Sequence, residues 1–175
     1  FRDTRKDDEK INSVILSGCF TGDTKVSLLD GRELSFLELL DEYGYDGKFL
    51  VYYCTSDGDI VPGLAHSGHK TMVSTRIAIV KLDNGEEIRC TPDHRFMLRD
   101  GSYTEAKDLS SILSLMSLNN TNVISVEITD SCVDVYDLEV DTYHNFALSS
   151  GVFVHNSIGV GKSTIAELIM MRKMY

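Results

Sequence analysis

Residues 71–98, TMVSTRIAIVKLDNGEEIRCTPDHRFML, show the pattern that dominates the chain. Two runs rich in β-branched residues flank Asn84-Gly85, a dipeptide typical of the tight turn of a β-hairpin. Similar short runs continue in both directions, separated by turn dipeptides such as Asp30-Gly31 and Asp100-Gly101. The pattern predicts an all-β domain. Within it, Ser35–Glu42, SFLELLDE, is the best candidate for a helix because it combines an N-cap serine with an apolar stripe.

The two ends of the chain differ from this central part. Residues 11–18, INSVILSG, predict a short strand, and residues 163–175, STIAELIMMRKMY, predict a helix. Residues 19–156 contain 22 of the 27 acidic groups but only 10 of the 17 basic ones, which accounts for the net charge of −10. Nucleic-acid-binding surfaces are normally basic, and no apolar run here reaches the roughly 18–20 residues of a membrane span. We therefore expect neither kind of partner.

The cysteines are too dispersed for a disulfide framework and form no Cys-x-x-Cys pair, so free thiols are expected. A zinc site from Cys54, Cys90, His66 and His69 is conceivable, but no second closely spaced ligand pair supports it, and no metal is expected. Otherwise the two histidines are expected to be solvated loop residues around Pro62-Gly63. The four cysteines are Cys19, Cys54, Cys90 and Cys132.

One weak internal repeat is present. Asp30–Leu39, DGRELSFLEL, aligns with Asp100–Leu109, DGSYTEAKDL, and each follows a short apolar run. A duplicated β unit explains the match, and so do two similar hairpin turns. Leu109–Leu118, LSSILSLMSL, is expected to be either a strand or a connecting loop.

A broken motif lies beside residue 156. The stretch SIGVGKST ends like the phosphate-binding P-loop G-x-x-x-x-G-K-[ST], with Gly161-Lys162-Ser163 in place, but Asn156 stands where the first glycine is required. Joining Gly18 directly to Ser157 would complete the motif, with the predicted strand before it and the predicted helix after it. The sequence therefore predicts that residues 19–156 are an insert in the P-loop of a host protein.

The residues at both ends of this insert suit self-removal, because Cys19 starts it, Asn156 ends it and Ser157 follows. With these boundaries the chain resembles an intein, a self-splicing protein insert. Four patches in order carry the resemblance over the whole of Cys19–Asn156. They are CFTGDTKV at the start, RCTPDHRF (Arg89–Phe96) with Thr91 and His94, VYDLEVDTYHNFAL (Val135–Leu148) with Asp137 and His144, and the closing VFVHN-S with His155 and Asn156.

The resemblance implies the horseshoe-like Hint fold, an all-β domain of two pseudo-twofold β-subdomains with one or two short helices. Both splice junctions would meet at its centre. The implied domains are an N-terminal host flank 1–18, a splicing domain 19–156, and a C-terminal host flank 157–175. The stretch between His94 and Val133 is too short to contain a homing endonuclease, so the insert is expected to be a mini-intein.

The resemblance also implies roles in the first step. Cleaving a peptide bond without water needs a side-chain nucleophile, and a thiol is a good one at neutral pH. Cys19 Sγ would attack the carbonyl of Gly18 to form a thioester. His94 would be the acid for the departing amine, and Thr91 would steady the tetrahedral oxyanion.

The later steps transfer the flank and release the insert. Ser157 Oγ would attack the thioester, with Asp137 organising its approach. Asn156 would then cyclise to a succinimide, with His155 assisting the departing amine and His144 polarising the amide. The freed amine of Ser157 would capture the ester, which leaves an ordinary peptide bond between the flanks. The reaction is a single-turnover, intramolecular one and needs no cofactor or outside protein.

Two other classes of function compete. A P-loop ATPase domain is one, but Asn156 breaks its motif and the segment after Ser163 is far too short for a nucleotide-binding sheet. An autoprocessing domain of the Hedgehog kind, which cleaves without ligation, is the other. The Asn156-Ser157 pair and the restored P-loop favour ligation.

The host is expected to be a P-loop ATPase and resembles the large subunit of a phage DNA-packaging terminase, while a helicase or recombinase fits nearly as well. The resemblance extends to inteins split near their N-terminus, for instance around Leu34–Ser35, whose partner is the complementary intein fragment. The N-terminal FRDTRKDDEK lacks an apolar export core. A cytoplasmic location in a bacterial cell, with a phage or prophage gene, is therefore expected.

Overall fold

The computed structural model describes residues 18–156, without the side chain of Ser67. The predicted strand 11–18, the predicted helix 163–175 and Ser157 with Gly161-Lys162-Ser163 therefore lie wholly or largely outside the described residues. The helices within residues 18–156 are too short or too polar to cross a bilayer. The short elements are β1 (Phe20–Thr21), β2 (Lys25–Ser27), β3 (Glu33–Ser35), α2 (Phe36–Tyr43), β4 (Lys48–Cys54), β6 (Glu87–Cys90), β7 (Arg95–Met97), β8 (Tyr103–Glu105), η1 (Ala106–Asp108), β10 (Asn145–Ala147) and β11 (Phe153–His155).

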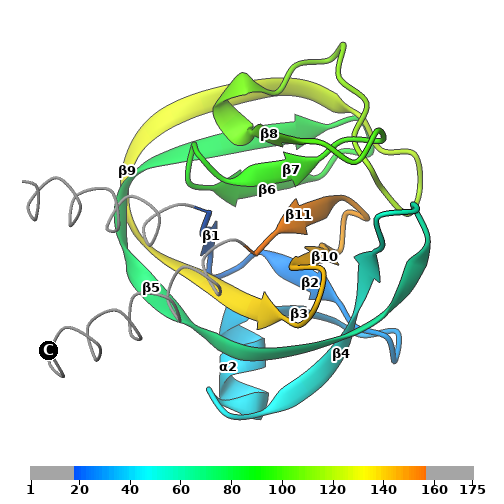
Figure 1. The fold of residues 1–175 in the computed structure, drawn as a ribbon. Coiled ribbons are helices and arrows are strands. Elements are labelled where there is room, and N and C mark those ends of the chain that lie inside the picture. Colours follow the sequence, from blue (N-terminus) through cyan, green and yellow to red (C-terminus); the bar gives the residue numbers. More distant parts are fainter. Residues whose placement is uncertain (1–17, 157–175) are drawn as a thin grey trace, which may run out of the picture.

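Two long strands, β5 (Ile60–Leu82) and β9 (Val123–Val140), dominate the fold. They pair antiparallel and curve around the short central strands β1, β10 and β11 (Figure 1). Several register shifts interrupt their pairing, and such bulges bend a strand and increase its twist. The strands belong to a five-stranded sheet in the order β4-β5-β6-β1-β9, beside a four-stranded sheet β10-β11-β7-β8 and a hairpin β2-β3. The all-β prediction is confirmed.

Residues 60–70 lie in β5, so the expected loop around Pro62-Gly63 was wrong. Proline removes a backbone donor, which usually excludes it from a central strand. Here Pro62 pairs only with β4, because the pairing of β5 with β9 begins at Ala65. Gly63 is needed at this place because a Cβ there would collide with the ring of Tyr53.

The helix prediction is confirmed with a shift of one residue. α2 begins after Ser35, whose hydroxyl accepts a hydrogen bond from Glu38 N–H while the Glu38 carboxylate accepts one from Ser35 N–H. This capping box satisfies two backbone donors that the first turn leaves open. Phe36 at the start of the helix is buried and stacks on Phe20 at 5.6 Å. Residues 109–118 form a connection outside the strands rather than a strand.

The structure shows that the chain contains a duplicated unit. Residues 21–39 and 91–109 make the same backbone hydrogen bonds at corresponding positions, with Thr21 matching Thr91 and the register constant thereafter. Each unit runs strand, glycine turn, strand and helix. The turn alone also recurs at Gly85, so the helix and the bonds around it identify the duplication. The bonds of the first unit, each matched at the corresponding residues of the second, are Thr24 N–H to Thr21 O, Gly31 N–H to Leu28 O, Phe36 N–H to Thr24 O and Leu37 N–H to Gly22 O.

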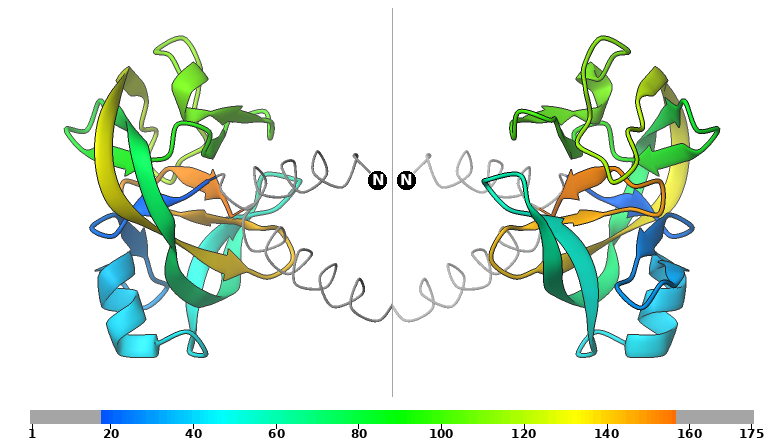
Figure 2. Two further views of the ribbon diagram at one scale, coloured as in Figure 1. Left: turned by 90° about the vertical axis from the view of Figure 1, so that its left-hand side faces the viewer. Right: turned by 90° about the vertical axis from the view of Figure 1, so that its right-hand side faces the viewer.

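A pseudo-twofold axis passes between β1 and β6. Phe20 and Cys90 are equivalent in the same register, and they pair with each other. α2 and η1 accordingly lie at opposite ends of the molecule (Figure 2). This is the pseudo-twofold Hint architecture that the resemblance implied. The axis also exchanges pairs of β5 and β9, namely Lys70–Tyr136 with Ala78–Ile128, and Ala65–Val140 with Leu82–Val123.

Candidate active site

The N-terminal junction lies where β1 enters the five-stranded sheet between β6 and β9. Cys19 directly precedes β1 and is fully buried. Its N–H donates to Thr91 Oγ1 at 3.1 Å, and Thr91 N–H donates to its carbonyl at 2.8 Å. Thr91 therefore contacts the nitrogen of the Gly18–Cys19 bond, not the carbonyl oxygen at which an oxyanion would form. The sequence located Thr91 at the junction, but the observed bond favours control of the leaving nitrogen.

His94 follows in the same turn, with its N–H bonded to Thr91 O at 3.1 Å. Its imidazole is fully buried and lies 4.0 Å from the ring of Phe20, centroid to centroid. Burial, and then the nearby His155, lower the pKa of His94 to about 3, because an apolar surrounding disfavours the charged form. His94 is therefore neutral at physiological pH.

The His94 ring lies against the backbone of both ends of the predicted insert. Contacts with the backbone of Gly18 and of His155 each act to raise its pKa, against the larger effect of burial. Within residues 18–156 neither ring nitrogen has a partner at full hydrogen-bond geometry. Catalytic hydrogen bonds are often loose in a resting enzyme and tighten during the reaction. One imidazole is thus shared by two junctions that lie far apart in sequence.

The C-terminal junction is built by β11, which pairs with β10 and β7. Asn156 follows β11 and is fully buried, and its N–H donates to His144 O at 2.9 Å. Neither atom of its side-chain amide has a hydrogen-bond partner among the described residues. His144 holds a left-handed backbone with φ of 55°, a conformation that costs free energy and recurs at functional sites. It is the backbone of His144, rather than its ring, that holds Asn156.

His155 lies between the two junction groups. Its ring meets the edge of Tyr103 at 4.9 Å. Burial lowers the pKa of His155 to about 4, and the nearby charges of Arg95 and His144 act in the same direction. His155 is therefore also neutral at physiological pH.

Asp137 is fully buried on β9, and its Oδ1 accepts a hydrogen bond from Leu138 N–H at 2.8 Å. Alternate residues of a strand face the same side, so Asp137 lies on the face of Val135, which packs with Cys19. This location agrees with the predicted role near the junction. Its predicted substrate, the hydroxyl of Ser157, lies outside the described residues.

Two residues near Cys19 were not expected from the sequence. The hydroxyl of Thr71 lies 3.0 Å from Cys19 Sγ. Gly18 N–H also donates to Asp93 Oδ1 at 3.4 Å. Asp93 belongs to the Thr-x-x-His segment, so a closer look at that motif could have found it. No motif marks Thr71, which only the pairing of β5 with β9 brings to the site.

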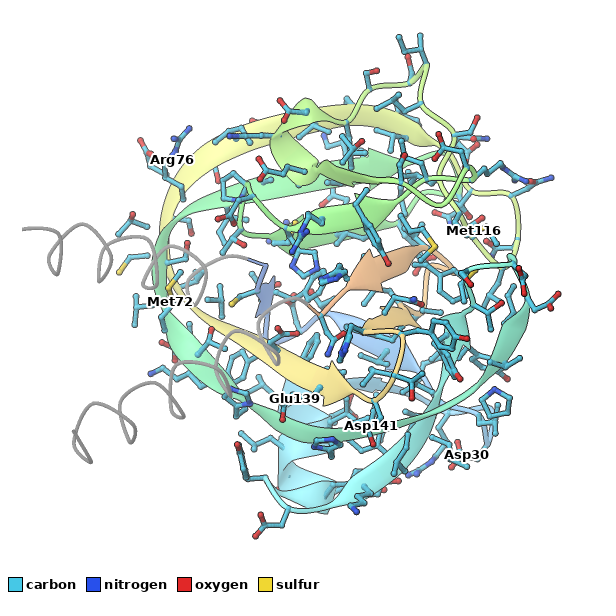
Figure 3. The ribbon with its side chains drawn as sticks, in the orientation of Figure 1. Asp30, Met72, Arg76, Met116, Glu139 and Asp141 are labelled. Atoms are coloured by element: carbon cyan, nitrogen blue, oxygen red, sulfur yellow. The ribbon has the colours of Figure 1, made fainter. Side chains whose placement is uncertain are left out.

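The alternative zinc site does not form. Cys90 belongs to the main core, and Cys54 belongs to a separate cluster with Met97 and Phe153. In residues 18–156 no group of three or more His, Cys, Asp or Glu side chains could hold a metal ion. His66 instead contacts Asp141 at 3.0 Å and Glu139 at 3.6 Å, two carboxylates labelled in Figure 3. The four cysteines are thiols rather than halves of disulfides, as expected.

Comparison with known proteins supports the intein resemblance. No family model matches the sequence. The chain is 42% identical over 121 residues to the B-type subunit of DNA gyrase from Synechocystis sp., which covers 69% of this chain but only 11% of the gyrase polypeptide. The crystal structure of a DnaB intein from Synechocystis sp. PCC 6803 matches with a TM-score of 0.67 and 26% identity, over 80% of this chain and 99% of that one. A bacterial intein-like domain from Clostridium thermocellum shares the fold, with a TM-score of 0.66 at 20% identity, over 79% and 99% of the two chains.

Proposed function

Because this chain belongs to the intein family, we propose that residues 19–156 excise themselves and join Gly18 to Ser157 by protein splicing. The observation that carries the proposal is the position of His94, whose buried ring lies against the backbone of both Gly18 and His155. A reaction that breaks two peptide bonds and joins their outer ends requires both junctions at one centre. The finer steps below are inferred from the side chains at each junction.

In the first step Cys19 Sγ attacks the carbonyl carbon of Gly18. His94 is neutral, so it is suited to accept the thiol proton first and to return it to the nitrogen when the carbon–nitrogen bond breaks. This order replaces the simple acid that the sequence suggested, because an imidazole with a pKa of about 3 holds no spare proton at neutral pH. Thr91 Oγ1, which accepts the bond from Cys19 N–H, orients the leaving nitrogen.

In the second step Ser157 Oγ attacks the thioester, and the sulfur of Cys19 leaves and regains a proton. Asp137 on the same face as Val135 is positioned to accept the serine proton. The N-terminal flank is then attached to Ser157 as an ester. The step is an exchange of one acyl bond for another and needs no external energy source.

In the third step the amide nitrogen of Asn156 attacks its own main-chain carbonyl. The succinimide ring forms, the bond to Ser157 breaks, and the proton lost by the amide passes to the new amine. Neutral His155 can relay this proton, while the bond from Asn156 N–H to His144 O holds the backbone in place. The amine of Ser157 then attacks the ester and completes the peptide bond.

The joined product would carry a complete P-loop motif, Gly18 followed by SIGVGKS, in a host ATPase of the kind suggested by the sequence. The proposed reaction needs no cofactor, metal, nucleic acid or membrane, and it would take place in the bacterial cytoplasm. A complementary intein fragment would be its partner only if the chain is made in two pieces.

Intact-mass measurement after expression tests the proposal. Splicing converts the 175-residue chain into a 138-residue insert and a 37-residue joined product. Cys19→Ala should abolish the joined product but still permit slow cleavage after Asn156, and Asn156→Ala should block release at that end. Persistence of the full wild-type chain for days at neutral pH would refute the proposal. Two separate flanks without a joined product would instead favour an autoprocessing domain.

A further inference from the structure

We propose that Thr71 is a further catalytic residue, whose hydroxyl holds the sulfur of Cys19 in place and hydrogen-bonds the thiolate as it forms. The inference rests on the proposed function, in which Cys19 is the first nucleophile. It adds a group on β5 that none of the four motif patches contains.

The distances give the Thr71 hydroxyl two alternative partners. Its oxygen lies 3.0 Å from Cys19 Sγ and 3.0 Å from the carbonyl oxygen of Val135. A threonine hydroxyl has one hydrogen to donate and can also accept, and that hydrogen rotates to suit its partners. While the thiol is protonated, the hydroxyl can donate to Val135 and accept from the S–H group. When the thiol loses its proton, the same hydroxyl can turn and donate to the sulfur.

The surroundings of the sulfur make such a donor important. Cys19 packs with Ile77 and Val135, and partly buried apolar side chains, including Met72, close the cluster. Met72, the neighbour of Thr71 along the strand, is labelled in Figure 3. An apolar environment disfavours a thiolate, whereas a hydrogen bond to the charged form favours it. Thr71 brings a polar hydrogen to the atom on which the negative charge develops.

The backbone around Thr71 departs from the symmetry of the fold. Thr71 is the extra residue of a β-bulge, because Lys70 pairs with Tyr136 and Met72 pairs with the next residue, Val135. The position that the pseudo-twofold axis makes equivalent is Thr129, which pairs regularly with Ile77. The bulge is therefore present only on the side of the axis that carries the nucleophile. Bulges re-aim a side chain, and this one directs Thr71 at Cys19.

The test isolates the first step. In the full chain with Asn156→Ala and Ser157→Ala, a thioester can form but cannot proceed. Dithiothreitol attacks its carbonyl, releases the thiol of Cys19 and carries residues 1–18 away as a new thioester, and the rate is measured by intact mass. In this background Thr71→Val, which keeps the shape but lacks the hydroxyl, should cleave about 10- to 100-fold more slowly, as expected for a lost bond to a charged group. Its rate should also continue to rise at pH values where the parent has levelled.

Two variants separate chemistry from structure. Thr71→Ser restores the hydroxyl and should recover most of the rate and the parental pH profile. Thr75→Val is the matched control, because Thr75 lies at the next register shift of the same strand and is exposed. It should cleave like the parent. Thr71→Ala is the second hydroxyl-free variant should the valine prevent folding, and circular dichroism verifies each fold.

Parental rates in folded Thr71→Val or Thr71→Ala, or equal slowing in the valine and serine variants, would overturn the inference. Failure of the proposed function is distinguishable from this result. In that case the parent background itself would release no N-terminal fragment with dithiothreitol, and it would behave like the same chain with Cys19→Ala. The role of Thr71 would then fall together with the proposed chemistry.

Discussion

Burial of His94 makes a quantitative prediction about acid sensitivity. Its pKa falls from 6.5 to about 3 because the ring is fully desolvated and lies near a second histidine. Below pH 6.5 the unfolded chain takes up a proton that the folded chain refuses until the pH approaches 3. The stability that His94 allows is therefore complete above about pH 6.5 and decreases as the pH falls through this window.

The size of the effect follows from these two pKa values. Each pH unit inside the window costs about 1.4 kcal/mol, so lowering the pH from 7 to 5 should remove about 2 kcal/mol of unfolding free energy through His94. The lowered pKa of His155 acts in the same direction and adds to the total. Removing His94 should therefore reduce the pH dependence without eliminating it.

Urea unfolding at pH 7, 6 and 5 provides the measurement. The reference chain carries Cys19→Ala and Asn156→Ala so that it stays intact, and the test chain adds His94→Gln. The absolute stability of the test chain is expected to be lower, because the substitution disturbs the contact with Phe20. The informative quantity is the difference between the two unfolding free energies, which should shrink by about 2 kcal/mol from pH 7 to pH 5. A constant difference would show that burial does not hold His94 neutral.

Two further predictions concern the scaffold and use the same urea assay in the reference chain. Gly151 and Gly85 both have φ of 89°, but a Cβ on Gly151 would also lie 2.5 Å from Asn119 Oδ1. Gly85→Ala should cost about 1 kcal/mol and Gly151→Ala clearly more, and equal costs would contradict the clash. Ser35→Ala should cost about 1 kcal/mol by removing the helix cap, with Ser35→Asp, which retains a capping oxygen, as the control. An unchanged unfolding midpoint would show that the cap is dispensable.

The duplication illustrates how far sequence comparison reached. Ten residues beginning at Asp30 and Asp100 suggested a repeat, but a hairpin turn explained them equally well. Outside those residues the side chains have diverged, so that Phe20 corresponds to Cys90 and Thr24 corresponds to His94. The backbone hydrogen bonds persist because they depend on main-chain atoms that every residue supplies. Only the paired strands therefore reveal the full extent of the two units.

Local chemistry in the sequence determined the strand-rich character, the capped helix at Ser35, the two ends of the insert and the motif residues around His94. Each of these depends on neighbours a few residues away, or on a motif whose spacing is visible in the chain. Tertiary structure alone decided that residues 60–70 continue a strand through Pro62, because that depends on which edge of β5 is paired. It also decided that Thr71 meets Cys19, since a bulge in the pairing of two strands that are distant in sequence sets the direction of its side chain.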